Sequence, residues 1–212
     1  MISPVAGLAA ESNATNVHDL AECYGDWSGI RTNQVITENG HFYGHDGSSR
    51  SISNPQDLEL LLALRRQAQI LVVDATTARL EKYRAPAEGI ILVLVSRTSN
   101  FAGIAAAESK SKNVYLACPE RSGNNWIATQ QNPWAAIQDF AMESAKPRIL
   151  AESGPNLTSL AFEAGLVQQS ALTITPLQSE LTGLNRFHPF DKRAQNLSIA
   201  QGPSSTFTLW AH

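Results

Sequence analysis

The pattern of apolar and polar positions along the 212 residues alternates between short apolar runs and longer amphipathic stretches. The runs at 70–73 and 90–95 are apolar and rich in β-branched residues, and they are too short for helices. They therefore predict strands buried on both faces of a sheet. By the same reasoning, further strands are predicted at 30–37, 114–118, 149–151, 172–175 and 206–210.

The stretches between these strands carry apolar residues at three- and four-residue spacing, which is typical of amphipathic helices. Asn54 is a helix cap and Pro55 a first-turn residue, so a helix is predicted from here through Ala68. Other helices are predicted within 8–24, 74–83 and 133–144, and at 156–164, where Gly165 follows as the helix stop. Alternating strands and helices predict an α/β fold in one domain, with a mostly parallel central sheet and an antiparallel C-terminal edge. Residues 1–28 are expected to form an N-terminal extension, and 29–212 the domain itself.

Composition and charge exclude several classes of protein. Sixteen basic residues against 19 acidic ones leave a net charge of −3, whereas a nucleic-acid binder typically has an excess of basic residues. No apolar run approaches the roughly 20 residues that span a bilayer, and the first residues lack the basic start of a secretory signal. Cys23 and Cys118 are too few for a disulfide scaffold and too far apart for a metal knuckle. We therefore expect a cytoplasmic protein without a metal centre or a membrane partner.

Candidate chemistry lies in the loops that follow the predicted strands, because ligands of open α/β sheets bind at the carboxyl ends of strands. The loop 153–156 places Gly154 and Pro155 at the start of a helix, whose N–H groups can bind an anion such as a diphosphate. Ser96 and Arg97 together offer a hydroxyl and a guanidinium, which would suit a phosphate monoester. A plain strand-to-helix turn and a solvated polar loop remain open as alternative interpretations. The sequence lacks the G-x-S-x-G, P-loop and G-x-G-x-x-G motifs, which argues against hydrolase, NTPase and standard dinucleotide-binding folds.

These loops together resemble one family. The run Asp74-Ala-Thr-Thr-Ala-Arg-Leu-Glu-Lys-Tyr83 follows a Leu-Arg helix end and a strand, and is similar to the family pattern G-A-G-T-V-R-A-E-x-Y. The run Glu152-Ser-Gly-Pro-Asn-Leu157, with Ala-Gly-Leu-Val at 164–167, is similar to E-G-G-P-x-L…A-G-L-V. The run 31–40 is similar to R-x-N-x-V-x-S-L-D-G. The family is the pyrimidine reductase of riboflavin biosynthesis, the C-terminal domain of RibD, whose fold is dihydrofolate-reductase-like.

The resemblance implies an NADPH-dependent oxidoreductase that transfers hydride to C1′ of a ribosylamino-pyrimidine 5′-phosphate and forms a ribityl product. It implies that the cofactor is bound by Ile36, Ser51, Thr77, Glu81, Ser96, Arg97, Gly154, Pro155, Asn156 and Leu157. It places the substrate at Ser49, Arg65 and Glu152. Glu38 and Glu152 are the candidate proton donors, and a homodimer is expected, with the strands around Leu172 and Leu209 as candidate interface.

Three positions depart from the family pattern, and they keep other functions open. Asn39 replaces an Asp, while Asp74 and Ser153 each replace a Gly in the cofactor loops. A carboxylate at Asp74 is unfavourable beside an anionic cofactor unless it is paired or points away. A reductase of the same fold that acts on a pterin- or folate-like substrate is therefore a second hypothesis, and a non-catalytic paralogue is a third.

Overall fold

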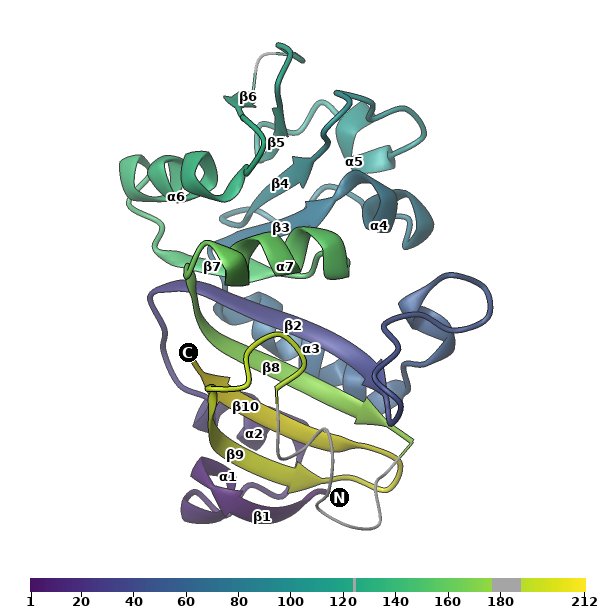
Figure 1. Ribbon diagram of the computed structural model, residues 1–212, viewed down its shortest axis with the longest axis vertical. Helices are drawn as coiled ribbons and strands as arrows, with labels where there is room; N and C mark the ends of the chain where they lie inside the picture. Colours follow the sequence, from purple (N-terminus) through teal and green to yellow (C-terminus); the bar gives the residue numbers. More distant parts are fainter. Residues whose placement is uncertain (124, 177–187) are drawn as a thin grey trace. The chain divides into compact units, whose positions relative to one another are not determined.

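A computed structural model describes residues 1–123, 125–176 and 188–212 (Figure 1). The chain forms two compact units that are each discontinuous in sequence. The first, which we call unit 1, comprises Met1–Trp27, Arg31–Gln67 and Val167–His212. The second, unit 2, comprises Ser28–Ile30 and Ala68–Leu166.

Unit 2 contains the parallel strands. Its strands are β3 (Ile70–Asp74), β4 (Ile91–Val95), β5 (Val114–Cys118), β6 (Trp126–Ala128) and β7 (Arg148–Ala151), in the order β7-β3-β4-β5-β6. Each neighbouring pair is parallel. Its helices are α4 (Ala75–Leu80), α5 (Ala105–Glu108), α6 (Trp134–Glu143) and α7 (Pro155–Glu163). All five residues of β4 are buried, which explains its uninterrupted apolar sequence.

Unit 1 contains the antiparallel strands. These are β1 (Ser3–Gly7), β8 (Val167–Thr175), β9 (Gln195–Gln201) and β10 (Thr206–Ala211), followed by β2 (Gly29–Thr37), in the order β1-β9-β10-β8-β2. The pairs β1–β9, β9–β10 and β10–β8 are antiparallel. The helices of unit 1 are α1 (Leu8–Glu11), α2 (Val17–Cys23) and α3 (Pro55–Gln67), with a 3₁₀ turn η1 (Ser49–Ser51).

The predicted α/β class, with parallel strands in the middle of the chain and an antiparallel C-terminal part, is confirmed. The predicted helix start is also confirmed, because the Asn54 side chain accepts hydrogen bonds from the amides of Gln56 and Asp57. Gly165 follows α7 with φ of 66°, the left-handed conformation expected of a helix stop. The single helix predicted within 8–24 is instead two helices, α1 and α2.

One strand that was not predicted lies in the connection between the last two predicted strands. This strand is β9, while residues 177–187 of the connection lie outside the described part. In β9 the fully buried positions are Ser198 and Ala200, whereas the larger Ile199 is only half-buried. Ser198 is tolerated inside because its hydroxyl accepts the Ala9 amide at 3.1 Å. Small residues thus occupy the buried face of β9, while the larger Ile199 lies on its other face, so the apolar pattern did not predict this strand. The strand β1, which pairs with β9, was not predicted either.

Unit 1 also holds a charged side chain in its core. Arg31 of β2 is fully buried, and its guanidinium lies 4.0 Å above the Trp27 ring. It donates hydrogen bonds to the carbonyls of Tyr24 and Gly25 at 2.9 and 3.0 Å, and to the Gln169 side chain at 2.9 Å. Burial lowers the pKa of Arg31 to about 10, so the side chain keeps its charge at neutral pH. This network fixes the chain that leads from α2 into β2.

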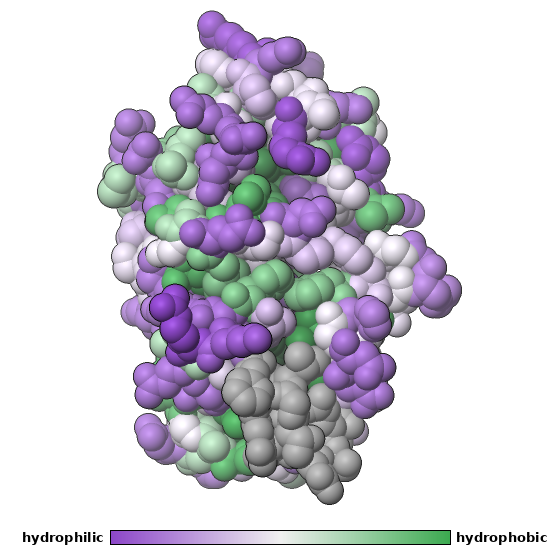
Figure 2. All heavy atoms as spheres, viewed as in Figure 1, coloured by the Kyte–Doolittle hydropathy of each residue, from purple (hydrophilic) through white to green (hydrophobic). Residues whose placement is uncertain are grey.

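Hydrophilic residues gather at the end of unit 2 where β5 and β6 are joined, at the top of the view in Figure 2. Glu120 and Arg121 of this connection are exposed. None of the helices in the described residues is long and apolar enough to cross a membrane.

Candidate functional site

The carboxyl ends of three parallel strands meet at one edge of the unit 2 sheet. Asp74 at the end of β3 is in register with Val95 at the end of β4, and Val72 of β3 is in register with Ala151 at the end of β7. The loops that begin at Asp74, Ser96 and Glu152 therefore lie beside one another, as the parallel arrangement predicts. This edge is the candidate site of unit 2.

The Asp74 carboxylate joins two of these loops. Its Oδ1 accepts the Thr77 amide at 2.8 Å, which makes Asp74 the N-cap of α4. Its Oδ2 accepts the Thr77 hydroxyl and the Gly154 amide, both at 2.7 Å. A carboxylate that accepts hydrogen bonds from two amides and a hydroxyl is well stabilised. Asp74 is thus paired, and Thr77, the predicted cofactor contact, has its hydroxyl directed to this carboxylate.

The start of α7 is built from Gly154 to Leu157. Gly154 is the N-cap, and Pro155 at the first helical position has no N–H to leave unpaired. Helix geometry leaves the amides of Asn156 and Leu157 without an acceptor inside the helix. Trp134 of α6 fixes the position of this turn, because its indole N–H donates to the Leu157 carbonyl at 2.8 Å.

Ser153, at the position where the sequence pattern that this loop resembles has a glycine, has its side chain turned into the protein. It is buried, and its Oγ lies 3.1 Å from the Thr158 Oγ1. The Thr158 hydroxyl also donates to the Ser153 carbonyl at 3.1 Å. The added hydroxyl therefore packs against α7 and is occupied there.

The loop after β4 begins with the buried Ser96 and the exposed Arg97. The Ser96 hydroxyl oxygen accepts the amides of Thr98 and Asn100 at 3.3 and 3.2 Å, which shapes the loop. Arg97 extends from the same edge of the sheet into solvent. The guanidinium is thus available to a ligand at this edge.

Glu152, a candidate for both substrate binding and proton donation, is buried at the end of β7. Its carboxylate accepts the Tyr83 hydroxyl at 2.5 Å. Tyr83 follows α4, whose C-cap is the half-buried Glu81. The Tyr83 hydroxyl and the Glu152 carboxylate are thus joined by a short hydrogen bond, which the sequence did not predict.

The other predicted site residues belong to unit 1. Ile36 is fully buried in a cluster with Leu172, Ile174 and Trp210. Ser49 and Ser51 form η1, and the Ser51 hydroxyl donates to the Asp46 carboxylate at 2.6 Å. Arg65 is half-buried in the last turn of α3, whereas Glu38 and Asn39 are exposed in the turn after β2.

Unit 1 also contains a buried carboxylate that the sequence reasoning missed. Asp57, in the first turn of α3, accepts the Ser53 hydroxyl at 2.5 Å. Burial raises the pKa of Asp57, while the hydrogen bond from Ser53 and the neighbouring Thr173 hydroxyl oppose the shift. The Ser53-Asn54-Pro55-x-Asp57 spacing, with a hydroxyl and a carboxylate on either side of a helix cap, is the signal that could have revealed it.

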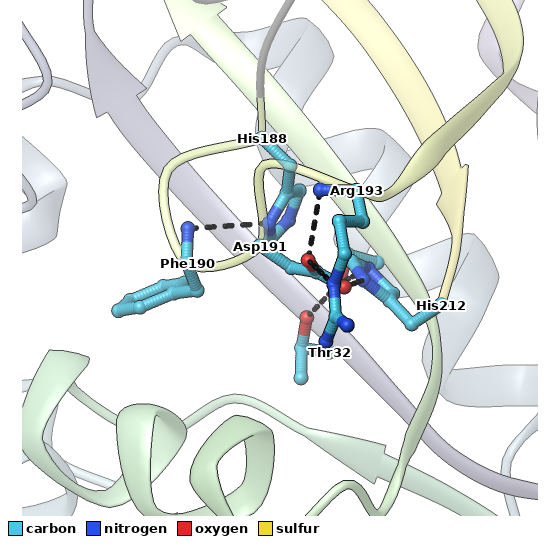
Figure 3. A network of polar contacts seen from close by, with 7 residues as sticks. Thr32, His188, Phe190, Asp191, Arg193 and His212 are labelled. Carbon is cyan, nitrogen blue, oxygen red and sulfur yellow. Dashed lines mark hydrogen bonds and ion pairs between the residues drawn. The ribbon is translucent and has the colours of Figure 1, made fainter.

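A Ser–His–Asp arrangement is also present in unit 1 (Figure 3). The Ser170 Oγ lies 2.9 Å from Nε2 of His212, and Nδ1 of His212 lies 3.2 Å from the Asp191 carboxylate. However, Ser170 is fully buried and its Oγ also accepts the Thr32 hydroxyl at 2.9 Å. A nucleophile must reach its substrate, so this network joins β2, β8 and the C-terminal residue and is not a hydrolytic site.

Comparisons with known proteins identify the fold. No family model matches the sequence, and no curated protein matches it in sequence either. Among solved structures, a pyrimidine reductase-like protein from Corynebacterium diphtheriae superposes with a TM-score of 0.76 at 19% identity, over 93% of this chain and 98% of that one. RibD of Acinetobacter baumannii gives 0.70 at 14% identity, over 92% of this chain and 60% of that one.

The riboflavin biosynthesis reductase of Saccharomyces cerevisiae gives a TM-score of 0.62 at 9% identity, over 87% of this chain and 89% of that one. The chain therefore spans about 60% of the A. baumannii protein but nearly the whole of the C. diphtheriae one. The fold is that of the riboflavin-pathway pyrimidine reductases, as the sequence motifs predicted.

Proposed function

We propose that this chain is an NADPH-dependent reductase of the riboflavin pathway, which reduces the ribosyl group of an amino-ribosylamino-pyrimidine 5′-phosphate to ribityl. The observation that carries the proposal is the match over nearly the whole length of both chains to a pyrimidine reductase-like structure. The loops after β3, β4 and β7, which carry the sequence motifs, lie at one edge of a parallel sheet in support of it.

Two parts of this edge, the start of α7 and Arg97, would hold a reduced nicotinamide dinucleotide. The amides of Asn156 and Leu157 would hold the diphosphate, since the start of a helix favours anions. Arg97, exposed after β4, would pair with the additional phosphate of NADPH. When bound, the cofactor supplies the hydride.

On the substrate side, the proposal assigns the phosphate to Ser49 and Arg65. Arg65 provides a guanidinium that suits a phosphate, and Ser49 a hydroxyl at the start of η1. Glu152 would orient the sugar and move a proton through the Tyr83 hydroxyl that it already binds. The buried position of Glu152 limits access of water to this pair.

The test is oxidation of NADPH by the purified protein in the presence of the ribosylamino-pyrimidine phosphate. Arg65→Met should raise KM for the substrate at least tenfold, because it removes a charged phosphate contact. Arg66→Met, at the neighbouring exposed position, is the matched control and should leave KM unchanged. Equal kinetics for the two variants would exclude Arg65 from the phosphate site.

The second candidate, a reductase of the same fold acting on a pterin- or folate-like substrate, is favoured by Asp57. A buried carboxylate can accept two parallel N–H groups from the edge of a 2-aminopyrimidine ring. The Thr173 hydroxyl, which is buried beside it, could accept or donate a further bond. A substrate panel separates the candidates: Asp57→Asn should abolish turnover of pterins and 2-aminopyrimidines but spare a pyrimidinedione.

The assembly and location of the protein are also part of the proposal. We expect a homodimer in the cytoplasm, as the resemblance implies. The strands around Leu172 and Leu209 stay the candidate interface; the side chains of these two residues are buried within the chain, so other residues of the strands would make the contacts. Sedimentation velocity would give the oligomeric state directly.

A further inference from the structure

We propose that Asp74 is an internal anion that occupies part of the diphosphate site of this chain and thereby sets a low affinity for dinucleotides. The identity of the ligand, a dinucleotide, is taken from the proposed function. The competition between Asp74 and the ligand is inferred from the hydrogen bonds that Asp74 accepts.

The start of α7 offers three amides to an anion, those of Gly154, Asn156 and Leu157, because Pro155 has none. The Asp74 Oδ2 already takes the Gly154 amide at 2.7 Å. A phosphate oxygen would have to displace the carboxylate to reach this amide, or bind at the remaining two beside a fixed negative charge. Both routes lower the affinity for a diphosphate.

Thr77 is engaged by the same carboxylate. Its amide and hydroxyl both donate to Asp74, at 2.8 and 2.7 Å, so neither is directed to a ligand. Moving Asp74 away from Gly154 would also cost the bond to the Thr77 hydroxyl, because both donors share Oδ2. The carboxylate is therefore held in place from two loops at once.

Asp74→Asn is the informative variant. Asn is as good a helix cap as Asp, and its Oδ1 can still accept the Thr77 amide, so α4 is retained. Its NH₂ group cannot accept the Gly154 amide, which becomes available, and the negative charge is removed. Asp74→Ser is a second variant, because Ser also caps a helix but its shorter side chain withdraws from Gly154.

Two probes separate this inference from the proposed function: NADPH, followed by quenching of its fluorescence, and inorganic pyrophosphate, followed by thermal stabilisation. We expect Asp74→Asn and Asp74→Ser to bind both at least tenfold more tightly than the wild type. The matched control is Asp139→Asn on α6, an exposed position with the same change of charge, and it should bind both like the wild type.

The outcomes are distinguishable. Tighter pyrophosphate binding by the Asp74 variants, with no NADPH binding by any protein, supports the inference and contradicts the proposed function. Equal affinities for wild type and both variants overturn the inference, even where NADPH binds and the proposed function stands. Failure of the variants to bind either probe overturns it as well, since the Gly154 amide is then no part of an anion site.

Discussion

Arg31 shows at the scale of one residue how a buried charge is accommodated. The indole ring of Trp27 faces its guanidinium, and two carbonyls and an amide side chain accept its N–H groups. Removal of the cation would leave these buried acceptors without a hydrogen-bond donor, which destabilises the fold.

We therefore expect Arg31→Met to lower the free energy of unfolding by about 3 kcal/mol. Unfolding in urea measures the loss. Arg66→Met, which changes an exposed residue of α3, should stay within about 0.5 kcal/mol of the wild type. A similar small effect for Arg31→Met would show that the network contributes little.

The buried His188 should make the free energy of unfolding depend on pH. Its ring is buried 5.7 Å from the Trp210 ring and 4.6 Å from the His212 ring. Burial, and then the neighbouring His212, lower the pKa of His188 to about 3, and burial also lowers the pKa of His212 despite the opposing Asp191. The His188 ring is therefore neutral in the folded protein at pH values where the unfolded chain takes up a proton, and His212 contributes in the same direction.

The unfolded chain binds the extra protons below its ordinary histidine pKa of about 6.5, so stability falls as the pH is lowered from there towards 3. The slope contributed by each ring is at most about 1.4 kcal/mol per pH unit. Urea unfolding of His188→Phe across this range should show a shallower loss than the wild type. Parallel curves for the wild type and His188→Phe would refute the assignment.

At the scale of elements, the start of α3 depends on Asn54. Its side chain accepts two amides of the first turn and donates to Ser204 and Ser205. Asn54→Ala should cost about 1 kcal/mol in thermal or urea unfolding, whereas Asn54→Ser, which keeps a capping oxygen, should cost less. Equal losses for the two variants would mean that capping is not what the side chain contributes.

The same scale shows which elements could be predicted from sequence. β3, β4 and α3 were predicted because burial of whole strands and the Asn54-Pro55 start leave local signals. β9 was not, although it pairs with the neighbouring β10, because small or polar residues such as Ser198 occupy its buried face. β1 was not, because it pairs with β9 nearly 200 positions away. Long-range pairing overrides the local pattern there.

At the scale of the whole molecule, the edge of the sheet that carries the candidate loops followed from the sequence, because parallel strands end on the same side. The bonding of Asp74 did not, since its partner Gly154 lies 80 positions further along the chain. The burial of Asp57 was not predicted for a similar reason, because Asp57 is buried beside Thr173 only when α3 packs against the C-terminal strands.

Binding of the cofactor should be visible as stabilisation of the whole chain. NADPH at 100 times its dissociation constant adds about 2.7 kcal/mol to the free energy of unfolding. For a chain of this size that corresponds to a rise in melting temperature of roughly 5–10 °C. The absence of any shift at millimolar NADPH, in Asp74→Asn as well as in the wild type, would favour the non-catalytic paralogue.

The most direct test of the account is hydride transfer itself. The protein is mixed with NADPH that carries deuterium at the transferable position and with the ribosylamino-pyrimidine phosphate, and the product is examined by mass spectrometry. A ribityl product with one deuterium at C1′ should form, with loss of the nicotinamide absorbance in equal amount. Unchanged substrate, in a protein shown to bind both ligands, would contradict the proposed function.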